Sequence, residues 1–290
     1  MNKIIVRKVI ALKTNRNKLL FAFWVLPFRF CFLVFLSCQR VVTIDLNSSA
    51  PQYVIQAPLY EGTHDFSVTI SQTTNYFSTD QPVYILNAKV VLSKSDNSAP
   101  VTLKNVGSGN YVAANYTASN SSTYILTVSD NGNTFVASSY MSKAVQIDSL
   151  IAAPRIVIGR NTEPDSFRIN CVFKDPAGVA NYYGFITIVN GVQKQRSNGR
   201  DLLVLSDRIS DGIKVTFPIR NVNFFLKDSV EVQLLSLDSK MYDYFNTLNL
   251  IDGGSGGNSV APTNPTSNWN NGALGYFGAF AYSSKTIIVK

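Results

Sequence analysis

The sequence has 290 residues, with 26 Lys and Arg against 18 Asp and Glu and a formal net charge of +8. Such a charge invites a nucleic-acid-binding interpretation, but residues 1–37 contain seven basic residues and no acidic one. Residues 38–290 therefore carry a net charge of only +1. The basic charge belongs to the N-terminal segment rather than to a binding face, so we expect no nucleic-acid partner.

The first element in chain order is an apolar stretch, residues 19–37, which follows the basic head. Its length suits a membrane-spanning helix, which needs about 20 residues. However, Pro27 would remove a helix hydrogen bond, and Arg29 would place a charge near the centre at a cost of about 2.5–3.5 kcal/mol. A basic head, an apolar middle and a small-residue exit are the parts of an export signal. We therefore expect residues 1–37 to be a signal peptide rather than a permanent anchor.

The exit of this segment reads Phe35-Leu36-Ser37-Cys38. It resembles the lipobox of bacterial lipoproteins, in which a small residue precedes a cysteine that receives a lipid; Phe35 stands where the usual pattern has Leu. Stable anchoring takes two or more acyl chains. We expect Cys38 to be the lipid-attachment residue and residues 38–50 to be a tether. The alternative is that Cys38 merely ends the apolar run.

Short segments of alternating hydrophobicity fill residues 51–146. Examples are FSVTIS (66–71) and TYILTVS (123–129), and turn-forming clusters such as KSDNSAP and GSGN separate them. Short strands at this spacing are typical of an immunoglobulin-like sandwich. We therefore predict an immunoglobulin-like β domain over residues 51–146.

A second set of strand-like segments begins near residue 147 and continues to SVEVQLLSLD (229–238). The period then changes, because apolar residues recur every three or four positions in SKMYDYFNTLNLID, which predicts a helix over residues 239–252. Ser239 is the expected N-cap, and TIIVK is the expected final strand. Residues 147–290 are thus predicted to form a second β-sandwich domain with one helix, which makes the protein all-β.

A long loop rich in Gly and aromatic residues is predicted over residues 269–280. Trp269, Tyr276 and Phe277 could pack over the sandwich, with the glycines permitting tight turns. They could instead form a contact surface for a partner or a sugar, because Trp and Tyr are frequent in interface hot spots. We expect packing, and the contact surface stays open as the alternative.

Candidates for chemistry are few. His64 and Asp65 could be half of a nucleophilic triad, but no serine elbow motif accompanies them, and one histidine is too few for the usual metal site. Two carboxylate pairs occur in turn-like segments without EF-hand spacing, and we interpret them as solvated loops: Glu163 with Asp165, and Asp207 with Asp211. We expect no catalytic residue, no metal and no cofactor.

Cysteine usage fits export without disulfides. Cys31 lies in the expected signal peptide, Cys38 at its exit, and Cys171 in the strand-like run FRINCVF. A lone cysteine in such a run is most often a buried apolar residue.

Several short motifs occur in the order of one known family: CQRVVTIDL (38–46), YVIQA (53–57), TTNYF (73–77), IDSL (147–150) and NNGALGYFGAF (270–280). Over residues 38–290 the chain resembles the Bacteroidota lipoproteins of domain of unknown function 4249. In that family the leader after the cysteine ends in an aliphatic-Asp-aliphatic triplet, here Ile44-Asp45-Leu46. The resemblance implies an exported, envelope-attached protein, often found alongside TonB-dependent outer-membrane receptors, in a family without an established activity.

The expected function follows from the lipid and the resemblance together. We expect a non-enzymatic lipoprotein, anchored in the outer membrane through Cys38, that is an accessory or ligand-handling partner of a TonB-dependent receptor. The alternative is a carbohydrate-binding or adhesive surface lipoprotein with a glycan ligand. Residues 39–42 read QRVV and lack the acidic cluster that often marks surface export in these bacteria, so we expect the periplasmic face.

Overall fold

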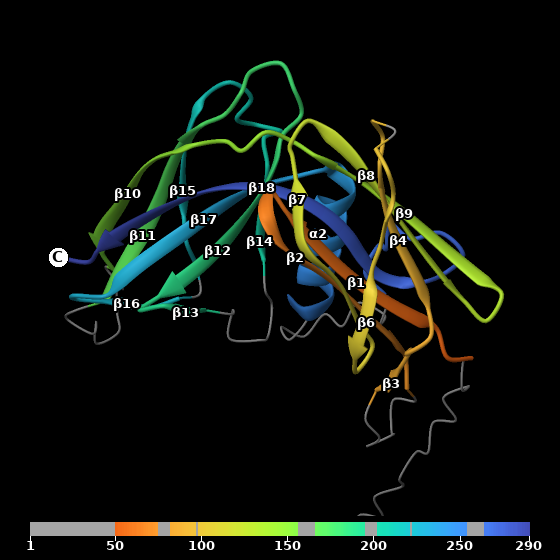
Figure 1. The fold of residues 1–290 in the computed structure, drawn as a ribbon. Coiled ribbons are helices and arrows are strands. Elements are labelled where there is room, and N and C mark those ends of the chain that lie inside the picture. Colours follow the sequence, from red (N-terminus) through yellow and green to blue (C-terminus); the bar gives the residue numbers. More distant parts are fainter. Residues whose placement is uncertain are drawn as a thin grey trace, which may run out of the picture. The chain divides into compact units, whose positions relative to one another are not determined.

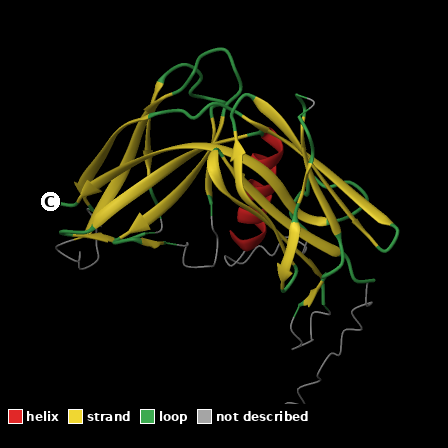
Figure 2. Cartoon of the chain, in the orientation of Figure 1, coloured by secondary structure: helices red, strands yellow, loops and turns green. Residues whose placement is uncertain are grey.

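The computed structural model describes residues 50–74, 82–96, 98–155, 166–194, 202–220, 222–253 and 264–290 (Figure 1). Ser49–Lys290 form one compact unit. The described part is mostly β-strand with one helix, so the predicted all-β sandwich class is confirmed (Figure 2). The expected signal peptide, Cys38 and most of the tether lie outside the described residues.

A ten-stranded sheet runs through the unit, in the order β13-β12-β17-β18-β1-β2-β7-β6, with β14 paired to β12 and β3 paired to β2. We call it the long sheet. Its strands are β1 (Tyr53–Tyr60), β2 (Gly62–Gln72), β3 (Val83–Tyr84), β6 (Lys104–Gly107), β7 (Asn110–Ala118), β12 (Tyr182–Val189), β13 (Val192–Gln193), β14 (Leu203–Ser206), β17 (Ser229–Leu237) and β18 (Leu274–Ile288).

Two four-stranded sheets accompany it (Figure 1). The first has the order β5-β4-β8-β9 and consists of β4 (Lys89–Lys94), β5 (Val101–Thr102), β8 (Ser122–Asp130) and β9 (Asn133–Met141). The second has the order β10-β11-β15, with β16 paired to β11, and consists of β10 (Ile147–Pro154), β11 (Ser166–Lys174), β15 (Lys214–Pro218) and β16 (Phe224–Phe225).

Alternation along β18 explains where the cores lie. Phe277 belongs to the core beneath the first small sheet, and Ile287 packs against the core beneath the second. Phe280 and Tyr282 have the opposite parity and pack with the helix. Successive side chains of a strand point to opposite faces. The two small sheets therefore cover one face of the long sheet, and the helix covers the other.

Strand β18 connects the two predicted domains. Its first half pairs in parallel with β1, from Val54↔Leu274 to Tyr60↔Phe280, and its second half pairs in antiparallel with β17, from Ser236↔Ala281 to Ser229↔Ile288. Strand β10 begins at Ile147, the first residue of the predicted second domain. The N-terminal core is nevertheless completed by a strand from the C-terminal region.

The prediction of a loop over residues 269–280 is wrong from Leu274 onward, where β18 begins. The glycines suggested turns, but Gly275 serves a close approach of two strands. It has φ +88°, and a Cβ atom there would lie 2.2 Å from the carbonyl oxygen of Ile55 on β1. A glycine inside a strand often marks such an approach.

Helix α2 (Ser239–Gly253) lies where the periodicity predicted it. The predicted N-cap is one residue off, because Asp238 and not Ser239 caps the helix: its Oδ1 accepts a hydrogen bond from the amide of Met241 at 2.8 Å. Asp238 also accepts bonds from the Ser139 hydroxyl at 2.5 Å and the Tyr140 amide at 3.1 Å, both on β9. The cap thereby fixes the helix to the first small sheet. In the described ranges, no helix has both the length and the apolar character needed to cross a bilayer.

Candidate functional site

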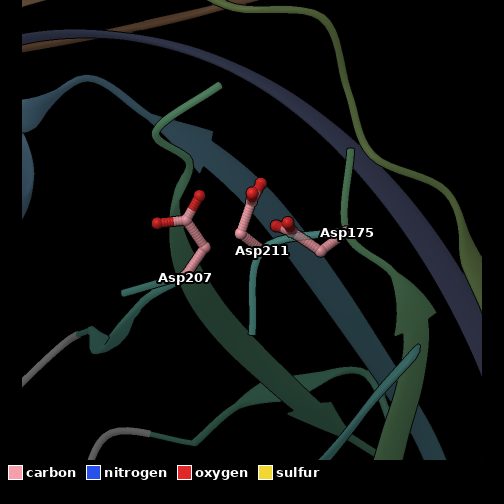
Figure 3. A group of neighbouring side chains, drawn as sticks. All are labelled: Asp175, Asp207 and Asp211. Carbon is pink, nitrogen blue, oxygen red and sulfur yellow. The ribbon is translucent and has the colours of Figure 1, made fainter. Parts of the chain in front are cut away.

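Three aspartates gather where the chain crosses between the long sheet and the second small sheet (Figure 3). Asp175 follows β11 on the way to β12, and Asp207 and Asp211 lie between β14 and β15. A carboxylate oxygen from each lies within 4.8 Å of those of the other two. We call these residues the aspartate clasp, and residues 207–213 the clasp loop.

Protein donors hold each carboxylate of the clasp. The Tyr183 hydroxyl and the Gly212 amide (2.9 Å) both donate to Asp175. The amide of Asn181 donates to Asp207 at 2.6 Å, and that of Gly178 donates to Asp211 at 2.8 Å. These bonds join residues 175–183 to the clasp loop, so the cluster fastens the two connections to each other.

The clasp also changes the acidity of Tyr183, which is 1 % exposed. Burial raises the pKa of this phenol, and its hydrogen bond to Asp175 and the negative charges of Asp175 and Asp207 raise it further. A phenol with a raised pKa keeps its proton and remains a hydrogen-bond donor. Tyr183 is therefore a structural donor and not a base.

Asp207 and Asp211 were predicted to be solvated loop residues, and for Asp207 this prediction is wrong. Asp207 is 7 % exposed and Asp175 is 1 % exposed, while Asp211 is exposed. Asp175 was missed because it is 32 residues away in the chain and directly follows a strand, where a polar residue is unremarkable. The other predicted pair, Glu163 and Asp165, lies outside the described residues.

Burial restricts what the clasp can do. Acid–base hydrolysis of a glycosidic bond requires two carboxyl groups that flank the scissile bond, and burial of Asp175 and Asp207 leaves no such exposed pair here. Carboxylate oxygens are ligands of the kind that Ca²⁺ prefers, but Ca²⁺ takes 6–8 of them. The hydrogen bonds from the protein account for the three aspartates as a structural clasp.

The clasp holds a loop that presents apolar side chains to solvent. Ile209 is 92 % exposed, Val179 64 % and Ile213 55 %. Val179 lies on the segment that donates to Asp211 and Asp207, and the two isoleucines lie on the clasp loop itself. Grouped exposure of large apolar side chains is typical of surfaces that contact another protein or a membrane.

The aromatic residues that the sequence singled out lie in or against the cores. Trp269 is 7 % exposed, and its indole N–H donates to the carbonyl oxygen of Ile55 at 3.1 Å. Phe277 is fully buried in the same core. Tyr276 is half-buried on the opposite face and lies 5.0 Å, between ring centroids, from Tyr244 of α2. Trp269 and Phe277 therefore pack as the favoured interpretation expected.

A family model matches the chain over residues 39–286, and its description is a domain of unknown function, DUF4249. The chain belongs to the DUF4249 family. The match extends from the expected tether through most of β18. No curated protein matches this chain.

The late DUF4249 motif NNGALGYFGAF has a structural explanation. Asn270 pairs with Val136 of β9 through two bonds, from its amide to the Val136 carbonyl at 3.1 Å and from the Val136 amide to its side-chain oxygen at 2.7 Å. The Asn271 side chain donates to the Thr134 carbonyl at 2.8 Å. Just upstream, the Asn268 side chain bonds both the amide and the carbonyl of Phe277. The asparagines thus fasten the segment before β18 onto β9 and onto β18 itself.

Among the described residues of this DUF4249 chain, neither the predicted His64–Asp65 pair nor Cys171 is placed for nucleophilic chemistry. His64 is exposed, and its Nε2 lies 3.1 Å from the Glu61 carbonyl oxygen, whereas Asp65 accepts a bond from the amide of Asn115. They do not form a dyad. Cys171 is fully buried, and burial raises the pKa of its thiol to about 12. A thiol that keeps its proton is a poor nucleophile.

Proposed function

We propose that this DUF4249 protein is a lipid-anchored protein of a bacterial outer membrane, without catalytic activity, that acts as an accessory or ligand-handling partner of a TonB-dependent receptor. One observation carries the proposal. The basic and apolar residues 1–37 end at Cys38 in a lipobox-like sequence, and the compact unit begins soon afterwards at Ser49. Residues 38–50 would then be the tether that carries the lipid and leads into the folded unit.

The non-catalytic part of the proposal is supported by how the candidate reactive groups are used. The clasp carboxylates accept bonds from protein donors, His64 and Asp65 bind different partners, and Cys171 is buried. Each has a structural role or a solvent-exposed position that accounts for it. An accessory protein of this kind would act through its surface.

The alternative is a carbohydrate-binding or adhesive lipoprotein, and the aromatic residues bear on it. A sugar-binding platform needs exposed aromatic faces, and Trp269 and Phe277 are buried. The receptor-partner proposal is therefore the better supported of the two. The absence of an acidic cluster in residues 39–42 supports attachment on the periplasmic side.

The anchoring part is tested by comparing the tagged full chain with Cys38→Ala in the native host. Cells are fed a fatty acid with a clickable group, and label on the protein is measured after export. We expect label on the wild type and none on Cys38→Ala, which should leave the membrane fraction. An unlabelled wild type that stays in the membrane with the variant would overturn the lipid attachment.

The partner part is tested by cross-linking intact cells and purifying the tagged protein. We expect a large β-barrel receptor to co-purify with the wild type. Recovery of bound glycan with no receptor would instead select the carbohydrate-binding alternative. Binding of the isolated protein to a glycan array would independently support the carbohydrate-binding alternative.

The clasp loop offers a sharper variant for this experiment. Ile209→Asp should reduce the recovered receptor if the loop is the contact, because it puts a charge where an apolar side chain would be buried. Leu250→Asp is the matched control, since Leu250 is 64 % exposed on α2. If Ile209→Asp and Leu250→Asp recover the receptor equally, the contact does not use the clasp loop.

A further inference from the structure

A pocket of about 280 Å³ opens at the end of the second small sheet where β16 pairs with β11. Three of its seven lining residues are arginines, and the other four are apolar. The lining consists of Arg155, Phe167, Arg168, Pro218, Ile219, Arg220 and Val222. It belongs neither to the aspartate clasp nor to the aromatic segment.

The strand register explains why three arginines meet here. On β11, Arg168 pairs with Ala153 of β10, and the amide of Arg155 donates to the carbonyl of Ser166 at 3.0 Å. On the other side of β11, Asn170 pairs with Pro218, and the amide of Ile219 donates to the Ile169 carbonyl at 2.8 Å. Continuing that register by one residue puts Arg220 opposite Arg168.

Residues opposite each other in an antiparallel pair project from the same face of the sheet. Arg168 and Arg220 therefore project from one face. Arg155 stands two residues beyond Ala153 and shares that face as the diagonal neighbour of Arg168. Like charges that face each other directly across two strands destabilise the pairing, so the sheet bears an electrostatic cost here.

No carboxylate relieves this cost in the described part of the chain. The ion pairs there join Lys94 to Asp96 and Lys214 to Asp148, and neither includes an arginine of the pocket. Arg155 donates through Nη1 to the side-chain oxygen of Asn223 at 2.6 Å. The Asn223 side chain is neutral, so it orients the Arg155 guanidinium but does not neutralise its positive charge.

We propose that this pocket binds a phosphate monoester carried on a small polyol, such as a sugar or a glycerol headgroup. Guanidinium groups bind phosphate through paired, parallel hydrogen bonds. A phosphate monoester carries about −1.5 to −2 charges at pH 7 and three acceptor oxygens. Such a ligand matches three guanidinium groups better than a ligand with a single carboxylate would. Phe167, Pro218 and Val222 supply apolar walls for the carrier. The volume lies just below the common range for small-molecule sites, about 300–1,000 Å³, which favours a small carrier.

The proposal does not depend on the receptor-partner function. The phosphate could belong to a soluble sugar phosphate or to the headgroup of a lipid such as phosphatidic acid. The shared chemistry is a terminal phosphate held by Arg155, Arg168 and Arg220, and the source is decided by experiment.

The first test uses residues 49–290, which form the compact unit, with inorganic phosphate as the probe in calorimetry and phosphorus NMR. Arg168→Gln and Arg220→Gln should each weaken binding about tenfold or more, because each removes a charged hydrogen-bond donor. Arg208→Gln is the control: Arg208 is exposed on the clasp loop and is the one other arginine in the described ranges. Equal affinity in all four proteins, or no binding of phosphate by the wild type, would overturn the proposal.

A second readout separates binding from a structural role. Without phosphate, Arg168→Gln should leave the melting temperature unchanged or raise it, because it removes a like-charge contact. Saturating phosphate should raise the melting temperature of the wild type and not that of the variant. A lower melting temperature of Arg168→Gln in phosphate-free buffer, with an unchanged response to phosphate, would mean that the arginine is structural and the proposal is wrong.

The pH dependence of phosphate binding and the nature of the phosphate's carrier are tested next. Phosphate affinity should fall as the pH drops below about 6, where the monoester gains a proton, whereas sulfate affinity should not change; identical profiles for the two would contradict a site for the dianion. Glucose 6-phosphate then competes against phosphatidylcholine vesicles containing phosphatidic acid. Binding of the sugar phosphate alone supports the proposal with a soluble source, and Arg168-dependent binding of the vesicles supports it with a lipid source.

Discussion

Cys171 stands in the middle of β11 with a side chain that solvent does not reach. Because burial raises the pKa of its thiol to about 12, almost no thiolate exists at pH 8. A protein of residues 49–290, in which Cys171 is the only cysteine, should react slowly with a thiol reagent such as Ellman's reagent in native buffer. It should react fully and quickly in denaturant. Rapid stoichiometric reaction of the native protein would show that this core opens easily.

The backbone geometry at Gly275 leaves little room for a side chain. Gly275→Ala combines a positive φ with a Cβ atom 2.2 Å from the Ile55 carbonyl, so we expect it to lower the free energy of unfolding by about 3 kcal/mol or more. Urea denaturation measures this loss.

Gly107→Ala is the matched control for Gly275→Ala. Gly107 has φ +102°, but a Cβ atom there would meet nothing within 4 Å. It should therefore lose only the conformational part, about 1–2 kcal/mol. Equal losses at the two positions would mean that β1 and β18 can separate to admit a methyl group.

At the scale of elements, the aspartate clasp links two connections through one phenol. Tyr183→Phe removes a donor from the buried carboxylate of Asp175, which should lower the free energy of unfolding by about 1–3 kcal/mol near pH 8. Tyr84→Phe, at an exposed tyrosine, is the control and should change it little. Urea unfolding of the three proteins measures both effects.

The same phenol gives this loss a dependence on pH. The pKa of Tyr183 is raised in the folded protein, whereas an unfolded tyrosine has a pKa of about 10. The stability contributed by the neutral phenol is therefore complete below pH 10 and is lost as the pH rises above it. The difference in stability between wild type and Tyr183→Phe should shrink above pH 10. A difference that stays constant to pH 11 would contradict the raised pKa.

The cap of α2 is a second link between elements. Asp238→Ala removes the partner of the Met241 amide, of the Tyr140 amide and of the Ser139 hydroxyl. Loss of a cap costs about 0.5–2 kcal/mol, and the buried hydroxyl left without its acceptor adds about 1–3 kcal/mol. Thermal unfolding should show this loss for Asp238→Ala and little change for Ser239→Ala. If Ser239→Ala were the more destabilising of the two, the N-cap would be Ser239, as the sequence predicted.

The positions of strands and helices were predictable where the local hydrophobic periodicity of the sequence determines them. Alternation identified strands such as TYILTVS within β8, and a spacing of three and four identified α2. The start of β18 was not predictable, because Gly275 looks like a turn residue until the approach of Ile55 is known. The partner strand β1 lies more than 200 residues away in the chain, and a parallel pairing over that separation has no signal in the local sequence.

Neither cluster of like charge was predicted in full, and the reason is the same for both; only the pair of Asp207 and Asp211 was recognised in the sequence. Asp175 joins Asp207 and Asp211 only because two connections cross between sheets. Arg155, Arg168 and Arg220 meet only because their strands pair in one register. Neither set has a spacing that a motif could capture, and tertiary pairing alone brings them together. The burial of Trp269 was anticipated from the general habit of aromatics, although its indole partner on β1 was not.

At the scale of the whole molecule, β18 makes the two cores depend on each other. Phe277 and Ala279 complete the first core, and Ile287 packs against the second. One continuous strand of 15 residues spans both. Unfolding either core would remove a pairing partner of this strand, so we expect the cores to unfold in one cooperative transition rather than as two domains.

Residues 49–290 contain a separate probe for each core, which makes this cooperativity measurable. Trp269 is the only tryptophan after residue 48 and lies in the first core, and Cys171 is the only cysteine after residue 48 and lies in the second. In a urea series, the fluorescence of Trp269 and the reactivity of Cys171 after a short reagent pulse should give the same midpoint, because coincident transitions by different probes mark two-state unfolding. The circular dichroism signal of the strands should follow the same curve. Exposure of Cys171 at a lower urea concentration than the change at Trp269 would mean that the second sandwich opens while β1 and β18 stay paired, and the two cores would then be separate folding units.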